Sequence, residues 1–348
     1  MTDCGGAAPW IVDNFVIAAS GDNPTTRVDG VRAVGDCHPV IDGNVRITGG
    51  GEGGTVGATG VHCGLAAGVT SRCVVLGNQL IEGSSFGYPP TSIGVMCEDG
   101  ACNRVANNTI TGRAGVDSWG VWLENTGAFV DSNIISGGCG TNSAVGLFSR
   151  DAWARVQNNA IAGGTCAGSS VAGREFIGLR VVAATGRNEL VVHSNTIDGA
   201  GMAAGCRSAA VAMDVAAMAP AGGEGIFRNN ILRAGVCSIA YGLWEQDAAA
   251  DPRIVENNDF DPFMMPAALY RDEDTTDVTT VAAVNALTDT TAAGNISVDP
   301  MFVGYPLNVH LGPTSMCIDA GSTVGSPRTD YEGETRDASP DIGADEFM

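Results

Sequence analysis

A short phrase recurs seven times along the chain: an apolar residue, two variable positions, an asparagine, one variable position, and then isoleucine, leucine or phenylalanine. Its copies place asparagines at Asn78, Asn108, Asn133, Asn159, Asn195, Asn230 and Asn258, and the residue two positions after the first of them is Leu80. The steps between asparagines, 25 to 36 residues, are too irregular for a coiled coil. A period of this length indicates stacked supersecondary units, each of which buries its apolar face only against its neighbours.

Each unit also carries a second apolar phrase, 12 to 18 residues before its asparagine. Examples are Gly-Val-His-Cys at 60–63, Gly-Val-Met-Cys at 94–97 and Gly-Val-Trp-Leu at 120–123. Two short strands per unit, with alternate residues pointing inward and outward, predict a coil with an aliphatic interior. The 49 glycines supply the turns between strands. We therefore expect one elongated all-β domain.

The C-terminal stretch narrows the fold further. It contains Asp-Pro-Met-Phe at 299–302, Ile-Asp-Ala-Gly at 318–321 and Asp-Ile-Gly-Ala-Asp-Glu at 341–346. With the repeats, these phrases resemble the bacterial secreted right-handed parallel β-helix family with NNxI-type repeats and a closing IDAG…DIGAxE module. The resemblance implies a single-stranded right-handed parallel β-helix, or solenoid, with a C-terminal capping segment. We expect an N-terminal cap at 1–27, right-handed β-helix repeats at 28–293 and the C-terminal capping module at 294–348.

The repeated asparagines need only a structural role. In stacked coils each amide can bond the backbone of a tight corner and the amide of the next coil, which satisfies groups that would otherwise be buried without partners.

The terminal carboxylates favour a similar interpretation. We expect a buried ion-pair network centred on an arginine to cover the open end of the solenoid. Calcium binding is the alternative, since oxygen-rich clusters beside glycine turns suit that ion, and no other metal or cofactor is indicated. The residues of this cap network are Asp319, Asp330, Arg336, Asp341 and Glu346.

The charge balance excludes several partners. The formal net charge is −21, and all 18 basic residues are arginine. Such a chain repels phosphate backbones and anionic lipid headgroups, so we expect no nucleic-acid partner. No run of 18 apolar residues is present, so we expect no membrane insertion.

Eleven cysteines indicate an oxidising compartment, which predicts an extracellular or cell-surface protein. Several hold equivalent places in successive units, and stacked strands lie about 4.8 Å apart, close enough for a disulfide. Buried free thiols are the alternative, and zinc is disfavoured because the histidines lack ligand spacing. The expected pairs, which leave Cys317 over, are Cys63–Cys97, Cys73–Cys102, Cys139–Cys166, Cys206–Cys237 and Cys4–Cys37.

One outward column carries the functional hypothesis. The position after the first inward residue of each upstream strand gives His62, Met96, Trp122, Phe148, Arg180 and Trp244, flanked by Glu98, Glu124 and Arg150. Aromatic rings beside charged groups can stack on sugar rings while bonding their hydroxyls, or can contact a protein. The alternative is that a corner loop or the C-terminal segment covers this column.

No catalytic residue is assigned. Lysine is absent, no paired aspartates lie on a repeat strand, and there is no Gly-x-Ser-x-Gly. We predict a secreted or cell-surface structural and interaction protein, a disulfide-stapled solenoid that presents a side face and corner loops to a glycan or protein. The alternative is a polysaccharide-degrading β-helix enzyme, a lyase or glycoside hydrolase, which has support from fold analogy alone.

Overall fold

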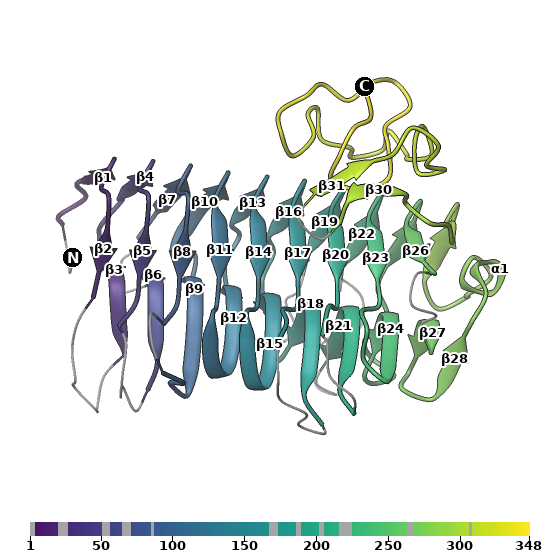
Figure 1. Cartoon of the computed structure of the whole chain (residues 1–348), viewed down its shortest axis with the longest axis horizontal. Helices are drawn as coiled ribbons and strands as arrows, with labels where there is room; N and C mark the ends of the chain where they lie inside the picture. The colour runs from purple at the N-terminus through teal and green to yellow at the C-terminus, as the bar shows by residue number, and fades with distance from the viewer. Residues whose placement is uncertain are drawn as a thin grey trace.

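The chain winds into a right-handed parallel β-solenoid, as the repeat predicts (Figure 1). The computed structural model describes residues 4–19, 27–50, 56–64, 71–84, 87–166, 173–185, 189–201, 205–215, 225–262, 267–305 and 308–348. Three sheets run along the solenoid, and each coil contributes one strand in turn to sheets A, B and C.

Sheet A holds the longest strands: β3 (Val28–Val34), β6 (Ala58–Gly64), β9 (Thr91–Glu98), β12 (Ala114–Glu124), β15 (Cys139–Arg150), β18 (Glu175–Ala183), β21 (Arg207–Val215), β24 (Ile239–Glu245), β27 (Ala268–Asp272) and the antiparallel β28 (Thr276–Val278). Sheet B holds β1 (Trp10–Val12), β4 (Val40–Asp42), β7 (Cys73–Leu76), β10 (Cys102–Ala106), β13 (Phe129–Asp131), β16 (Arg155–Gln157), β19 (Val191–His193), β22 (Ile226–Arg228), β25 (Ile254–Glu256) and β29 (Thr291–Ala293).

Sheet C holds β2 (Ile17–Ala18), β5 (Ile47–Thr48), β8 (Ile81–Glu82), β11 (Thr109–Thr111), β14 (Ile134–Ser136), β17 (Ala160–Ala162), β20 (Thr196–Asp198), β23 (Ile231–Arg233) and β26 (Asp259–Asp261). A helical turn, α1 (Val281–Val284), and a hairpin of β30 (Phe302–Gly304) and β31 (Asn308–Leu311) complete the described elements.

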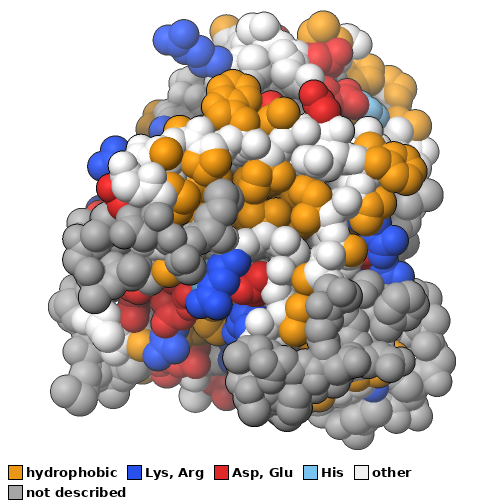
Figure 2. Space-filling model, turned by 90° about the vertical axis from the view of Figure 1, so that its left-hand side faces the viewer, with side chains coloured by type: hydrophobic (Ala, Val, Ile, Leu, Met, Phe, Trp, Pro, Cys, Tyr) orange, Lys and Arg blue, Asp and Glu red, His pale blue; other side chains and the backbone are white. Residues whose placement is uncertain are grey.

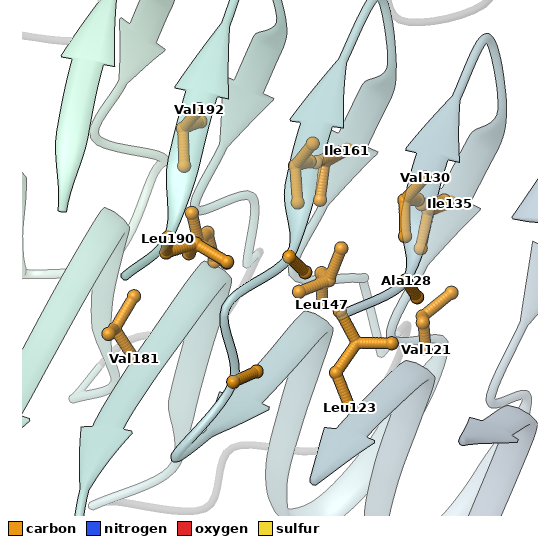
Figure 3. Packing of buried hydrophobic residues seen from close by; sticks show 14 of the residues in the cluster. Val121, Leu123, Ala128, Val130, Ile135, Leu147, Ile161, Val181, Leu190 and Val192 are labelled. Carbon is orange, nitrogen blue, oxygen red and sulfur yellow. The ribbon is translucent and has the colours of Figure 1, made fainter. Parts of the chain in front are cut away.

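The interior is a set of aliphatic ladders, because equivalent residues of successive coils stack directly on one another. Val105, Val130, Val156 and Val192 pair in register in sheet B, and each is fully buried. Isoleucines form the facing ladder in sheet C (Figure 3). Full burial of one such side chain contributes roughly 1.5–3 kcal/mol, so the repeated core is the main source of stability.

The corner between sheets B and C explains the repeated asparagine. The residue before it adopts a left-handed backbone, as at Asn107 (φ 57°), Ser132 (φ 54°) and Asn158 (φ 55°). The next asparagine then points into the solenoid. Asn133, for example, donates from Nδ2 to the Val105 carbonyl (2.8 Å) and to Oδ1 of Asn159 (3.0 Å).

The asparagine ladder extends beyond the seven copies of the phrase. Asn14 and Asn44 precede it, and Asn295 and Asn285 continue it. The coils of Asn14 and Asn44 do not fit the sequence pattern, because each has one extra residue between the asparagine and the isoleucine. The coil of Asn78 has the same extra residue, so Ile81 rather than Leu80 fills the core there, and Leu80 is half-buried.

Two of the five expected disulfide pairings are wrong. The structure joins Cys63 to Cys73 and Cys97 to Cys102, within one coil each. Cys63 does stack on Cys97 in sheet A, and Cys73 on Cys102 in sheet B. However, stacked residues of a parallel sheet point their Cβ atoms side by side, whereas the ends of consecutive strands face each other across the corner.

The other three bonds join adjacent coils where the backbone leaves the regular ladder. They are Cys4–Cys37, Cys139–Cys166 and Cys206–Cys237, with Cα–Cα distances of 4.8, 4.9 and 5.1 Å. Cys317 is a buried free thiol that donates from Sγ to Oδ2 of Asp259 at 3.6 Å. Burial chiefly, with the Asp259 carboxylate beside it, raises the pKa of this thiol well above its ordinary value.

Residues 308–348, the larger part of the capping module expected at 294–348 and called the C-terminal module below, lie along the side of the solenoid (Figure 1). The expectation that this segment covers the open end is therefore wrong. It contacts the B–C corners: Asn158 donates to the Thr329 carbonyl at 2.9 Å, and Asn229 donates to the Ser322 carbonyl at 2.8 Å. The end itself is covered by the segment around α1, whose Val284 is fully buried in the core.

Within the module, Arg336 is the centre of a buried network. It pairs with Glu346 at 3.0 Å and donates to the Gly343 carbonyl at 2.9 Å and to Asn158 of the solenoid at 3.3 Å. Asp330 and Asp341 are buried and accept backbone N–H groups. Asp319 is exposed, and its N–H donates to Asp341 Oδ1 at 2.8 Å.

At the opposite end, the first coil presents apolar side chains. Figure 2 shows hydrophobic side chains gathered over this end of the molecule. Trp10 and Phe15 are 71% and 78% exposed, while Ile11 and Ile17 pack against the core.

Candidate binding face on sheet A

The outward column predicted from the repeat is aligned in the structure. Parallel pairing places His62 beside Met96, Met96 beside Trp122, Trp122 beside Phe148, and Phe148 beside Arg180. Ala212 separates Arg180 from Trp244 in the same column. The sheet therefore brings residues up to 182 positions apart in sequence into one outer face.

A second aromatic column, which the sequence pattern missed, lies beside the first. Trp119 stacks between Ile93 and Val145, and further along the same column lies Tyr241. Inward and outward residues alternate along a strand, and counting back from the outward Trp122 would make Gly120 outward as well. Instead Gly120 faces the core, since an added Cβ there would meet the buried Ile135 at 2.6 Å. Two successive inward positions bend the strand there, and only a residue without a side chain fits. The recurring glycine was the available signal.

Trp119, Trp122 and Phe148 form a compact aromatic cluster, here called the aromatic ridge. The rings of Trp122 and Phe148 are stacked with centroids 4.2 Å apart, and Trp119 meets Trp122 edge to face at 4.9 Å. All three are partly exposed. Such pairs contribute about 0.5–1.5 kcal/mol beyond burial, so the ridge is rigid before any partner arrives.

Charged groups border the ridge on both sides. Glu124 accepts a hydrogen bond from Trp122 Nε1 at 3.1 Å and lies 3.6 Å from Arg150. On the other border Glu175 pairs with Arg180 at 2.7 Å. These ion pairs are partly exposed, so their own contribution to stability is small. The arrangement offers an apolar surface with hydrogen-bonding groups of both signs at its edges.

Trp244, at the far end of the column, is covered. Its indole Nε1 donates to Asp274 in the β27–β28 turn at 3.0 Å, and Arg207 lies 5.9 Å from the ring centroid. Only 5% of Trp244 is exposed. At this end another segment therefore covers the column, as the alternative predicted. The rings of the ridge, by contrast, keep accessible surface.

At the near end, His62 is held between two carboxylates. Its Nε2 lies 2.8 Å from Glu98, and its Nδ1 lies 3.4 Å from Asp29. Burial opposes a charge on the imidazole, but the hydrogen bonds that the protonated ring donates to Asp29 and Glu98 outweigh it and raise the pKa of His62. Both ring nitrogens are occupied, so the geometry is that of a structural ion pair.

Neither a metal site nor a membrane span is found in the described parts of the chain. No group of three or more His, Cys, Asp or Glu side chains there is placed to hold a metal ion. The carboxylates of Asp330, Asp341 and Glu346, where calcium was the alternative, accept N–H bonds instead. No helix among the described residues is long and apolar enough to cross a membrane.

Comparison with known proteins finds a similar solved structure but no matching family. No family model and no curated protein sequence matches the chain. Among solved structures it is similar to one described as "The complex structure of XylC with xylose", with 12% sequence identity and a TM-score of 0.43. The alignment covers 89% of this chain and 50% of that one, so the chain spans about half the length of that structure.

Proposed function

We propose that the protein is an extracellular β-solenoid that binds a glycan through the outer face of sheet A. Five disulfides among the described cysteines fit an oxidising environment. The rigid solenoid holds the binding groups on long strands, where their positions vary little.

The observation that carries this proposal is the partly exposed stack of Trp122 on Phe148, bordered by Glu124 and Arg150. The faces of sugar rings carry C–H groups that pack on aromatic rings, while their hydroxyls bond to carboxylate and guanidinium groups at the edges. The ridge offers both, and the excess of carboxylates favours a neutral glycan over a polyuronate.

A glycan array tests the proposal. The fluorescently labelled protein should bind a subset of neutral cell-wall or capsular glycans, and Trp122→Ala should weaken that binding about tenfold or more, which corresponds to about 1.4 kcal/mol. Trp10→Ala is the matched control, because it removes an exposed tryptophan from the first coil, away from the ridge.

Binding that is equal for the wild type, Trp122→Ala and Phe148→Ala would refute the glycan role of the ridge. Capture of a cell-surface protein that depends on Trp122 would instead support a protein contact. Release of shorter sugars from a bound glycan would favour the alternative, a polysaccharide-degrading enzyme.

A further inference from the structure

A second site lies on another face of the molecule, between the outer surface of sheet C and the start of the C-terminal region. A cleft of about 470 Å³ opens there. Arg233 (β23) and Asp261 (β26) form its floor, and its walls are Asp299, Met301, Phe302 and Tyr305. Its volume falls within the range of small-molecule sites, about 300–1,000 Å³.

The polar floor of the cleft is fixed in place. Arg233 Nε lies 2.7 Å from Asp261, and their side chains are 9% and 1% exposed. The guanidinium lies 3.8 Å from the Tyr305 ring centroid, and the Tyr305 hydroxyl donates to Asp198 on the adjacent strand. The Arg233 guanidinium is already paired with the Asp261 carboxylate and the Tyr305 ring. It therefore orients Asp261 and is not placed to bind an anionic ligand.

The apolar wall is accessible. Phe302 stacks on Tyr305 with centroids 5.3 Å apart and is partly exposed, and Met301 is 46% exposed. Asp299 lies at the exposed rim, where Oδ1 accepts the Met301 N–H at 2.8 Å. An aromatic face therefore meets the accessible carboxylate of Asp299 within one small cleft.

We propose that this cleft binds a single neutral sugar ring, whose C–H face packs on Phe302 while its hydroxyls donate to Asp299 at the exposed rim. One arginine and two aspartates give the lining a formal charge of +1 − 2 = −1, which disfavours anions. The guanidinium beside Asp261 disfavours a divalent cation. This site is separate from the ridge and does not depend on the function proposed for it.

Saturation-transfer NMR of the whole protein with glucose, galactose, mannose and N-acetylglucosamine tests the inference, with glucuronate and calcium chloride as competing probes. At least one neutral sugar should bind with a dissociation constant on the order of 1 mM. Phe302→Ala should weaken binding about tenfold, whereas Val303→Ala, which changes an exposed neighbour on the same strand, should leave it unchanged.

Gly304→Leu provides a second variant that does not remove packing. Among the described residues, a Cβ at Gly304 would meet Asn308 alone, at an ordinary 3.5 Å, so we expect the new side chain to fill the cleft and block binding. Trp122→Ala should leave monosaccharide binding intact, which separates this site from the ridge.

Three results would overturn the inference. They are no saturation transfer from any neutral sugar up to about 50 mM, equal binding by the wild type and Gly304→Leu, and tighter binding of glucuronate or calcium than of every neutral sugar.

Discussion

At the scale of single residues, the repeated asparagines hold each coil of the solenoid to its neighbours. Asn133 receives the N–H and the amide of Asn108 and donates to Asn159, so each coil is bonded to the coils on both sides. Its side chain is fully buried, which makes any unpaired group at this place costly.

Asn133→Ala should therefore destabilise the protein strongly. It leaves the Val105 carbonyl and the Asn108 N–H without these partners, and each unsatisfied buried group costs about 1–3 kcal/mol, so we expect a loss of about 2–6 kcal/mol. Urea unfolding followed by circular dichroism measures it, with the exposed Asn142→Ala as the control. A loss no larger than the control's would contradict the ladder as a source of stability.

The cysteines allow a second test at this scale, because the sequence separations of the bonded pairs differ. The Cys97–Cys102 bond spans 5 residues, whereas Cys4–Cys37 spans 33. In the chain-entropy model the first contributes about 2 kcal/mol and the second about 3.5 kcal/mol.

Replacing both cysteines of a pair with alanine should thus cost more for Cys4–Cys37. Thermal unfolding of the two double variants compares the costs, and disulfide mapping by mass spectrometry checks the pairing. Recovery of a Cys63–Cys97 peptide would contradict bonds within one coil.

Among the elements, strands β24 and β27 bury a titratable pair in the last coils. Glu245 on β24 is 1% exposed and accepts a hydrogen bond from the hydroxyl of Tyr270 on β27. Burial is the main cause that raises the pKa of Glu245 to about 8. The folded protein thus holds this proton at pH values where the unfolded chain has lost it.

Stability should accordingly fall as the pH rises from about 4.5, the ordinary pKa of the group, through 8. The slope from Glu245 is at most about 1.4 kcal/mol per pH unit. Glu245→Gln should flatten the profile between pH 6 and 9 in urea unfolding, whereas Glu124→Gln, on the partly exposed border of the ridge, should not. An unchanged slope in Glu245→Gln would show that another group is responsible.

The sequence predicted the elements better than their contacts. The repeated valines and asparagines defined the stacking because one residue type recurs at each inward place. Trp119 was missed because Gly120 interrupts strand alternation, and the position of the C-terminal module was missed because nothing local distinguishes the end of a solenoid from its side. The partners of Cys63 and Cys97 depend on the direction of their side chains, which the spacing of cysteines along the sequence does not show.

At the scale of the whole molecule, the solenoid and the C-terminal module are joined by buried polar contacts and by an apolar cluster in which Ile231 of β23 packs with Leu311, Cys317 and Ile342. Arg336 makes several of the polar contacts, since it bonds Glu346 and the Gly343 carbonyl in the module and Asn158 of the solenoid. Breaking one partner of a buried ion pair costs about 3–5 kcal/mol, because the other charge stays buried.

Arg336→Ala should release the module while the coils persist. Limited proteolysis should then cut within residues 308–348 much faster than in the wild type and spare residues 87–166. Arg328→Ala, at an exposed position of the same module, is the control. Equal cleavage rates in both variants would contradict the role of Arg336 in docking.

A crystal structure of the protein with an oligosaccharide selected on the array tests the central claim, that sheet A is the binding face, most directly. We predict a sugar ring packed on Trp122 and Phe148, with its hydroxyls bonded to Glu124 or Arg150. A sugar bound elsewhere, with the ridge bare, would contradict it.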